Sequence, residues 1–130
     1  LIDCPPSLSL LTVNGLCAAT KVIVPLQCEY YALEGLSELL QTIKRIKEKL
    51  NPPLEFGGVV LTMHQRTRLA NQVEQDVREH LKGHVFETII PRNVTLSEAP
   101  GFGQPVINYD QRAAGAEAYI KLAKEVSANG

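Results

Sequence analysis

Three short runs of apolar, largely β-branched residues, separated by longer amphipathic segments, constrain how this chain can fold. The runs cover residues 21–26, 56–62 and 85–91. Runs that are apolar on both faces are typical of parallel strands that helices cover on each side. Because helical segments alternate with these runs, their order predicts a parallel, layered α/β sheet with right-handed crossovers. The 130 residues show no internal repeat, low-complexity stretch or linker, so we interpret residues 1–130 as a single unit.

The spacing of apolar residues places helices between and around the strands. Apolar residues recur every three or four positions in residues 32–50 and 69–81, which are expected to be helical. Residues 10–19 and 110–126 are expected to form two further helices. Asn51-Pro52-Pro53 and Gly83 supply stop signals for the two central helices. Asp110 is a favourable N-cap for the last helix. The predicted order is a strand end, three pairs of helix and strand, a loop and a final helix.

Composition limits the classes of function that the chain can serve. The formal net charge is −1, so the surface as a whole attracts neither nucleic acid nor an anionic membrane, and any such contact needs a local basic cluster. No apolar run approaches the ~20 residues of a membrane span, and the first residues lack the pattern of a signal peptide. The chain is therefore expected in the cytoplasm, without membrane contact.

Cysteines and histidines could mark a metal site, but their spacing favours structural roles. The cysteines lack paired C-x-x-C spacing and are expected to be buried, reduced thiols: Cys4, Cys17 and Cys28. His80 and His84 have the i, i+4 spacing of a helical metal pair. Gly83 lies between them and is expected to end the helix, so a surface or capping role is the favoured interpretation.

The carboxyl ends of the strands are where an open α/β sheet binds ligands. The segments at those ends are expected along one edge of the sheet and comprise residues 3–6, 27–30, 62–65 and 91–93. Asp3 follows two apolar residues, which is the arrangement of a Walker B acid, whose carboxylate holds Mg²⁺ usually through water. This short pattern leaves an alternative open, in which Asp3 is the N-cap of the helix that follows Pro5-Pro6.

Longer stretches resemble one family. The sequence carries IDCPPSL, VPLQCEYYALEGLSELL, VVLTM, IIPRNVTLSEAP and NYDQRAAGAEAYIKLAKEV. Together they resemble the carboxyl-terminal half of ParA/Soj-type partitioning ATPases, which belong to the deviant Walker A branch of the P-loop proteins. The resemblance implies a homodimer that holds two ATP–Mg²⁺, binds DNA without sequence preference and is stimulated by a ParB-type partner. It also implies association with the nucleoid in the cytoplasm during chromosome or plasmid segregation.

The resemblance assigns roles to individual residues. Asp3 corresponds to the Walker B acid, and Pro5 and Pro6 belong to the switch segment that responds to the γ-phosphate. The strand-end residues that match the loops around the adenine are Thr62, Met63, Pro91, Arg92 and Asn93.

DNA binding is expected from a local group of arginines. Arg66 and Arg68 lie in the loop before a helix, where relatives carry a basic residue that contacts DNA, and phosphate contacts from them would be salt-sensitive. The alternative is a solvated, charged loop. Arg92 and Arg112 are further candidates, although Arg112 could instead pair with Asp110 or Glu98. Thr95 stands where some relatives have an arginine, which predicts a thinner or displaced DNA surface.

The phosphate-binding motif is missing from these residues. No G-x-x-x-x-G-K-[ST] occurs in the 130 residues, nor the family's variant with an extra lysine. We therefore expect a carboxyl-terminal fragment that begins at the Walker B strand, does not hydrolyse ATP alone, and self-associates through an unpaired sheet edge. One rival is a MinD-like cell-division ATPase, but the tail AYIKLAKEVSANG lacks the amphipathic membrane helix that MinD uses. The other rival is a non-catalytic regulator or scaffold that keeps the half-fold.

Overall fold

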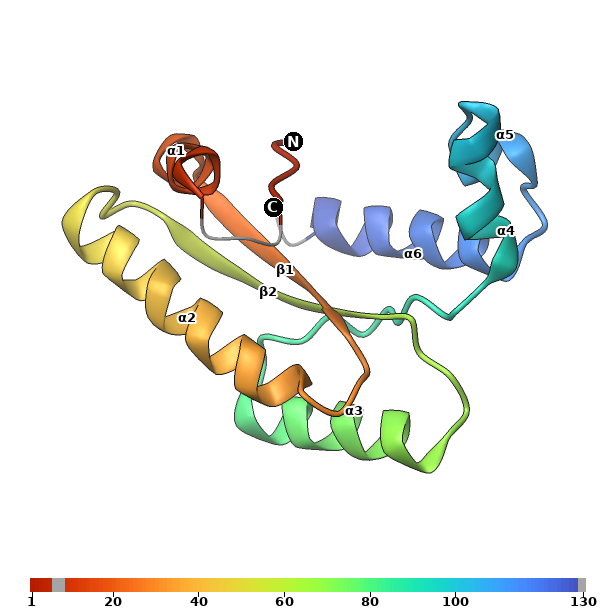
Figure 1. The fold of residues 1–130 in the computed structure, drawn as a ribbon, viewed down its shortest axis with the longest axis horizontal. Helices are drawn as coiled ribbons and strands as arrows, with labels where there is room; N and C mark the ends of the chain where they lie inside the picture. The colour runs from red at the N-terminus through yellow and green to blue at the C-terminus, as the bar shows by residue number, and fades with distance from the viewer. Residues whose placement is uncertain (6–8, 129–130) are drawn as a thin grey trace.

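The computed structural model describes residues 1–5 and 9–128. Figure 1 shows two long strands crossed by helices on both sides. In chain order the elements are α1 (Leu10–Ala18), β1 (Lys21–Gln27), α2 (Ala32–Lys49), β2 (Glu55–Thr62), α3 (Arg68–His80), α4 (Val94–Glu98), the 3₁₀ helix η1 (Ala99–Phe102), α5 (Val106–Tyr109) and α6 (Ala114–Ala128). The predicted strands over residues 21–26 and 56–62 are therefore present, as are the first three predicted helices, within one or two residues at their ends.

β1 and β2 form a parallel pair, as the sequence predicted. Their register runs from Lys21 opposite Glu55 to Gln27 opposite Thr62, with a shift at Gly57, which has no partner in β1. The shift is a bulge, in which one extra residue is accommodated in one of the two strands. The next residue, Gly58, has φ +125°, a conformation that residues with a side chain rarely adopt. The double glycine is therefore the reason why β2 can bend at this point.

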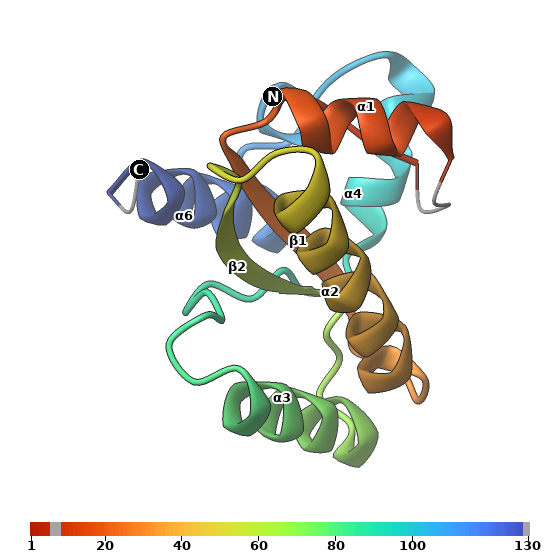
Figure 2. The same cartoon turned by 90° about the vertical axis from the view of Figure 1, so that its left-hand side faces the viewer.

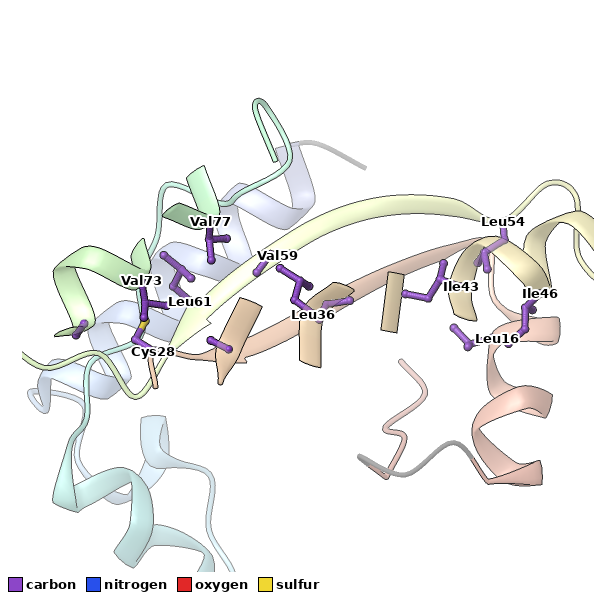
Figure 3. Close-up of a cluster of buried hydrophobic side chains, with 13 residues drawn as sticks. Leu16, Cys28, Leu36, Ile43, Ile46, Leu54, Val59, Leu61, Val73 and Val77 are labelled. Carbon is purple, nitrogen blue, oxygen red and sulfur yellow. The ribbon is translucent and has the colours of Figure 1, made fainter. Parts of the chain in front are cut away.

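Both faces of the sheet are covered, which is why the strands are apolar on both sides. Val59 and Leu61 of β2 face the main core cluster, together with side chains from α1, α2 and α3. Figure 3 shows Val73 and Val77 of α3 against Leu61 at one end of this cluster. On the opposite face, Val60 packs with Ala118 of α6. Figures 1 and 2 show the same layering, with α2 and α3 on one side of the strands and α6 on the other.

A buried asparagine joins the first helix to the turn before β2. The side-chain amide of Asn51 donates to the carbonyl groups of Leu16 and Ala19, both at 2.8 Å. Asn51 is only 7 % exposed, and buried amide groups of this kind are costly unless they are paired. The residue predicted only as part of a helix stop therefore also satisfies the carbonyl end of α1.

The predicted strand over residues 85–91 is only partly formed. Among the described residues it makes two isolated parallel bridges to β2, Val85 with Val59 and Pro91 with His64, instead of a continuous ladder. The segment thus runs beside β2, but its middle turns away from the strand. The sequence prediction of a regular third strand was wrong in this respect.

A glutamate from the last helix accounts for the interruption. The two carboxylate oxygens of Glu125 accept hydrogen bonds from the backbone N–H groups of Glu87 (2.7 Å) and Thr88 (3.0 Å). These amides therefore bond to α6 and not to β2. Burial alone would raise the pKa of the Glu125 carboxyl, but these hydrogen bonds and the charge of Arg78 outweigh it and lower the pKa below its usual value.

Glu125→Ala is expected to destabilise the fold by about 1–2 kcal/mol, because two amides lose a charged acceptor at a partly exposed site. A carboxyl group whose pKa is lowered on folding stabilises the protein above its unfolded pKa, near 4.5, and this contribution is lost as the pH falls through the folded value. Urea unfolding at pH 7 and pH 3 should therefore show a difference between wild type and variant that is large at pH 7 and small at pH 3. Lys124→Ala, on the neighbouring position of the same helix, is the control. An equal difference at both pH values would contradict this role.

The first residues do not form the expected strand end. Leu1–Asp3 make no ladder with the described strands and lie against α1, where Ile2 and Cys4 approach Gly15. A Cβ atom at Gly15 would lie 2.9 Å from Cys4 Sγ, so the glycine allows this close approach. The segment therefore packs on a helix and not beside β1.

The final helix begins later than predicted. α6 starts at Ala114, and Asp110 is not its N-cap, because the Asp110 side chain accepts a hydrogen bond from the backbone N–H of Arg112 (3.0 Å) in the preceding turn. The predicted loop before it contains the short helices α4, η1 and α5. Short helices of this kind carry too few residues to show an apolar period in the sequence.

Candidate functional site

Three strand-end segments meet at one edge of the sheet. The backbone N–H of Cys28 donates to the carbonyl of Thr62 (3.1 Å), and the N–H of Arg92 donates to the carbonyl of His64 (2.9 Å). The His64 N–H in turn donates to Ile90 (3.2 Å). The expected meeting of strand ends is thus confirmed for the segments that follow β1, β2 and residues 85–91.

Asp3 is placed apart from these three segments. It is exposed, and within the described part of the chain its carboxylate makes no hydrogen bond or ion pair. The alternative role as a helix N-cap is wrong, because Ser9 caps α1 with its side chain. Pro5 is also exposed, and its carbonyl accepts a weak hydrogen bond from Thr12 (3.5 Å). Pro6 lies outside the described residues.

The residues predicted to frame a base show backbone strain and a competing role. Met63 directly follows β2, is 38 % exposed and has φ +53°. Positive φ is uncommon outside glycine, and such strained residues concentrate at functional sites. Asn93 has a structural role, because its side-chain oxygen accepts from the Leu96 N–H (3.3 Å) and caps α4. Thr62 and Pro91 are partly buried next to them.

The four candidate arginines are all exposed, at positions 66, 68, 92 and 112. Arg66 lies in the loop before α3, whereas Arg68 is the first residue of that helix. Arg92 is tied through its backbone to His64, two residues before Arg66 in the sequence. In the described residues Arg112 forms no ion pair with Asp110 or Glu98, so neither of those alternatives is present.

A charged cluster that the sequence prediction missed lies between α3 and the strand ends. Nε2 of His64 lies 3.2 Å from Oε2 of Glu74, and Oε1 of Glu74 accepts from Nε of Arg78 at 3.0 Å. The His64–Glu74 pair is close but does not have hydrogen-bond geometry, so Nε2 is buried without a hydrogen-bond partner among the described residues. Arg78 also donates to the carbonyl of Phe86 (3.3 Å). The i, i+4 spacing of Glu74 and Arg78 was the available signal, but it is common on exposed helices.

The thiols and the other histidines form no metal site. Cys28 is buried, and burial followed by the nearby Glu74 charge raises the pKa of its thiol to about 11. Cys17 is exposed and Cys4 only partly buried, so the expectation of three buried thiols was wrong for these two. His80 contacts the carbonyl of Asp76 and His84 packs on Phe56. No group of three potential ligands that could hold a metal ion occurs in residues 1–5 and 9–128.

An open groove of about 490 Å³ runs beside the strand ends, between them and α6. It is lined by His64, Glu87, Thr88, Ile89, Pro91, Ala114, Glu117, Ala118 and Lys121. The groove therefore joins two of the strand-end segments to the last helix, and its wall is mixed in polarity.

The acid and the strand-end residues offer the ligand types of a magnesium–nucleotide site, but the structure does not bring them together. The exposed, unpartnered carboxylate of Asp3 offers hard oxygen ligands of the kind that Mg²⁺ accepts directly or through water. Main chain at Met63 and the ring of Pro91 offer hydrogen-bonding groups and an apolar surface to a flat ring. A glycine-rich loop for the phosphates is not part of the 130 residues.

Comparison with known proteins finds extended similarity to proteins that are named for chromosome partitioning. The "AAA domain" family model matches residues 1–56. The chain is 58 % identical over 127 residues to the chromosome partitioning protein ParA of Caulobacter vibrioides, and covers 48 % of that relative. It is 56 % identical over 131 residues to the sporulation initiation inhibitor protein Soj of Bacillus subtilis, and covers 52 % of it. The two alignments include 97 % and 100 % of this chain, respectively. The chain spans about half the length of these curated relatives.

Solved structures agree on the fold. Cobyrinic acid a,c-diamide synthase from Mycobacterium smegmatis, solved with an ATP analogue and magnesium, matches 94 % of this chain and 44 % of its own with a TM-score of 0.75 and 36 % identity. The cell division ATPase MinD from Pyrococcus furiosus matches 98 % of this chain and 51 % of its own with a TM-score of 0.77 and 23 % identity, a likeness of fold alone. The predicted α/β class with a parallel sheet between helices is therefore confirmed. None of the described helices has the length and apolar character needed to cross a membrane.

Proposed function

We propose, on the premise that this chain is a ParA/Soj-type sequence, that it is the carboxyl-terminal part of an ATPase that partitions chromosomes or plasmids. The similarity to ParA and Soj relatives over nearly the whole chain, at 55–58 % identity in the best-matching examples, carries this proposal. The chain covers only 45–52 % of those relatives. We therefore assign the activity to the intact protein that contains the chain and not to these residues alone.

In this proposal the intact protein binds ATP and Mg²⁺ near the strand ends. Asp3 holds the hydrated ion, Pro5 and Pro6 belong to the segment that senses the terminal phosphate, and residues 62–63 and 91–93 frame the base. The exposure of Asp3 and the strained main chain at Met63 support these roles. Mg²⁺ supplies charge neutralisation at the phosphates when it is bound.

The intact protein is further proposed to act as a homodimer, with a ParB-type partner, on DNA at the nucleoid. DNA contacts are assigned to Arg66 and Arg68, with Arg92 and Arg112 as additional contacts. The support is that all four side chains are exposed and free of ion pairs in the described part of the chain. Exposed arginines are suited to phosphate contacts, which do not depend on sequence.

The DNA assignment predicts a specific loss. In the intact protein with ATP, Arg66→Ala combined with Arg68→Ala is expected to weaken binding to duplex DNA by about tenfold or more and to reduce the salt slope by about 2. Fluorescence anisotropy with a labelled duplex at several salt concentrations measures both. Arg45→Ala, which removes an exposed arginine from α2, is the control. Equal affinity and slope in the double variant and the control would place the DNA surface elsewhere.

A MinD-like cell-division ATPase remains the second candidate, because the MinD structure shares the fold over 98 % of this chain. That candidate predicts ATP-dependent binding to vesicles of anionic lipid. Co-sedimentation of the intact protein with such vesicles and, in parallel, retention on DNA separate the two functions. Binding to vesicles without binding to DNA would favour the MinD-like function.

A further inference from the structure

We propose that Glu74 is a positioning residue that ties α3, and with it the basic loop of Arg66 and Arg68, to the strand ends. The link consists of His64, Glu74 and Arg78 and is called here the α3 clamp. Its existence is argued from the contacts of this chain, whereas its consequence for DNA rests on the proposed function.

Glu74 lies beside the residue that follows β2 and next to Arg78 on α3. One carboxylate oxygen lies 3.2 Å from His64, which follows β2, and the other lies 3.0 Å from Arg78. Arg78 reaches the carbonyl of Phe86 in the segment beside β2. The Glu74 charge also acts on Cys28, which follows β1. The Glu74 carboxylate thus contacts the end of β2 directly, and through Arg78 it is linked to the start of the segment beside β2.

The three side chains of the α3 clamp are largely shielded from solvent. The side chains of His64, Glu74 and Arg78 are 15 %, 26 % and 28 % exposed. Charge pairs at partly buried sites are screened less by water and salt than exposed pairs. By contrast, the Lys44–Glu48 pair on α2 has side chains 76 % and 59 % exposed and a separation of 4.0 Å. Glu74–Arg78 is therefore better suited than Lys44–Glu48 to hold its position, and the His64 imidazole lies in close contact with it.

His64 transmits the position of Glu74 to the backbone of the site. Its own N–H and C=O make the hydrogen bonds to Ile90 and Arg92 that align the two loops. It also directly follows Met63, whose backbone is strained. Strained conformations persist only where surrounding contacts hold them. The contact of the His64 side chain with Glu74 helps to hold this backbone in place. A displacement of α3 would therefore move the backbone of residues 63, 90 and 92.

Amide hydrogen exchange on the full 130-residue chain tests the link. Glu74→Ala is expected to raise exchange at the amides of His64 and Arg92 by about tenfold, because local opening governs exchange at such sites. Glu79→Ala makes the same change five residues later on an exposed part of α3 and should alter those rates by less than about twofold. The amide of Val59, which donates to His84, reports global stability. Unchanged rates at His64 and Arg92, or an equal rise at Val59, would overturn the proposal.

Glu74→Gln keeps the size of the side chain and removes the charge, which covers the case in which the alanine variant does not fold. It should shift the imidazole ¹⁵N signals of His64, whereas Glu79→Gln should leave them in place. Unshifted signals in Glu74→Gln would also overturn the proposal.

A short DNA duplex then separates the clamp from the proposed function. If the α3 clamp exists and the loop binds DNA, the duplex shifts the amide signals of Arg66 and Arg92 in wild type. In Glu74→Ala it shifts only the signal of Arg66. If DNA shifts no signal in wild type, DNA binding by this loop is wrong, and the exchange rates alone decide the clamp. If the Arg92 signal shifts equally in both proteins, the clamp does not connect the two loops.

Discussion

Replacing Asp3 with alanine in the intact protein is expected to lower ATP turnover by at least about a hundredfold, the typical cost of removing one group that stabilises charge in the transition state. The carboxylate is exposed and unpaired in the described residues, so it is available to a hydrated Mg²⁺ and does not support the fold through a contact of its own. Phosphate release at saturating ATP and Mg²⁺ measures the effect.

A matched substitution keeps this result interpretable. Asp76→Ala removes a partly exposed aspartate from α3 that accepts a hydrogen bond only from Gln72 at its side chain among the described residues. It should retain turnover within about twofold, because a surface change outside the site has little effect. Circular dichroism should be the same for both variants. Turnover that survives Asp3→Ala would show that Asp3 is not the Mg²⁺ acid.

Replacing Gly58 with alanine is expected to destabilise the chain by about 2–4 kcal/mol, the sum of a forbidden backbone conformation and a clash with main chain. Gly58 has φ +125°, and a Cβ atom there would lie 2.9 Å from the carbonyl oxygen of His84. That oxygen accepts the hydrogen bond of Val59 at 2.8 Å, so it cannot move without loss of pairing. Urea unfolding followed by circular dichroism gives the difference in free energy.

The neighbouring glycine supplies the control. A Cβ atom at Gly57 would approach Lys21 Cγ at 2.8 Å and Ile23 at 3.2 Å, and its φ is not in the positive region. These contacts are with side chains and not with main chain, so Gly57→Ala should cost less than Gly58→Ala, by about 1 kcal/mol or more. Similar costs at the two positions would show that backbone conformation at Gly58 does not decide the stability of β2.

The sequence predicted the layered fold because burial on both faces leaves a direct mark on composition. Val59, Val60 and Leu61 of β2 are buried in a run that is apolar on both faces, and α2 has one apolar face at helical spacing, so the apolar pattern identified both. The incomplete third strand could not be predicted in this way. It depends on Glu125, which lies 37 residues from Thr88 and competes with β2 for backbone amides. No local pattern reports such a distant contact.

The sequence predicted only the part of the candidate site that lies at the ends of the strands. Thr62, Met63 and Pro91 lie together because parallel strands end at one edge. The positive φ of Met63 leaves no mark in the sequence, and the α3 clamp joins His64 to Glu74, which lie ten residues apart across a loop and a helix. Asp3 was singled out by two apolar neighbours, but the structure packs that segment on α1.

ATP hydrolysis by the intact protein and by the 130-residue chain, measured side by side with and without Mg²⁺, tests the central claim most directly. The account predicts Mg²⁺-dependent turnover by the intact protein and none above the buffer rate by the chain, which lacks a phosphate-binding loop. An intact protein that does not hydrolyse ATP, or a chain that hydrolyses it alone, would contradict the account.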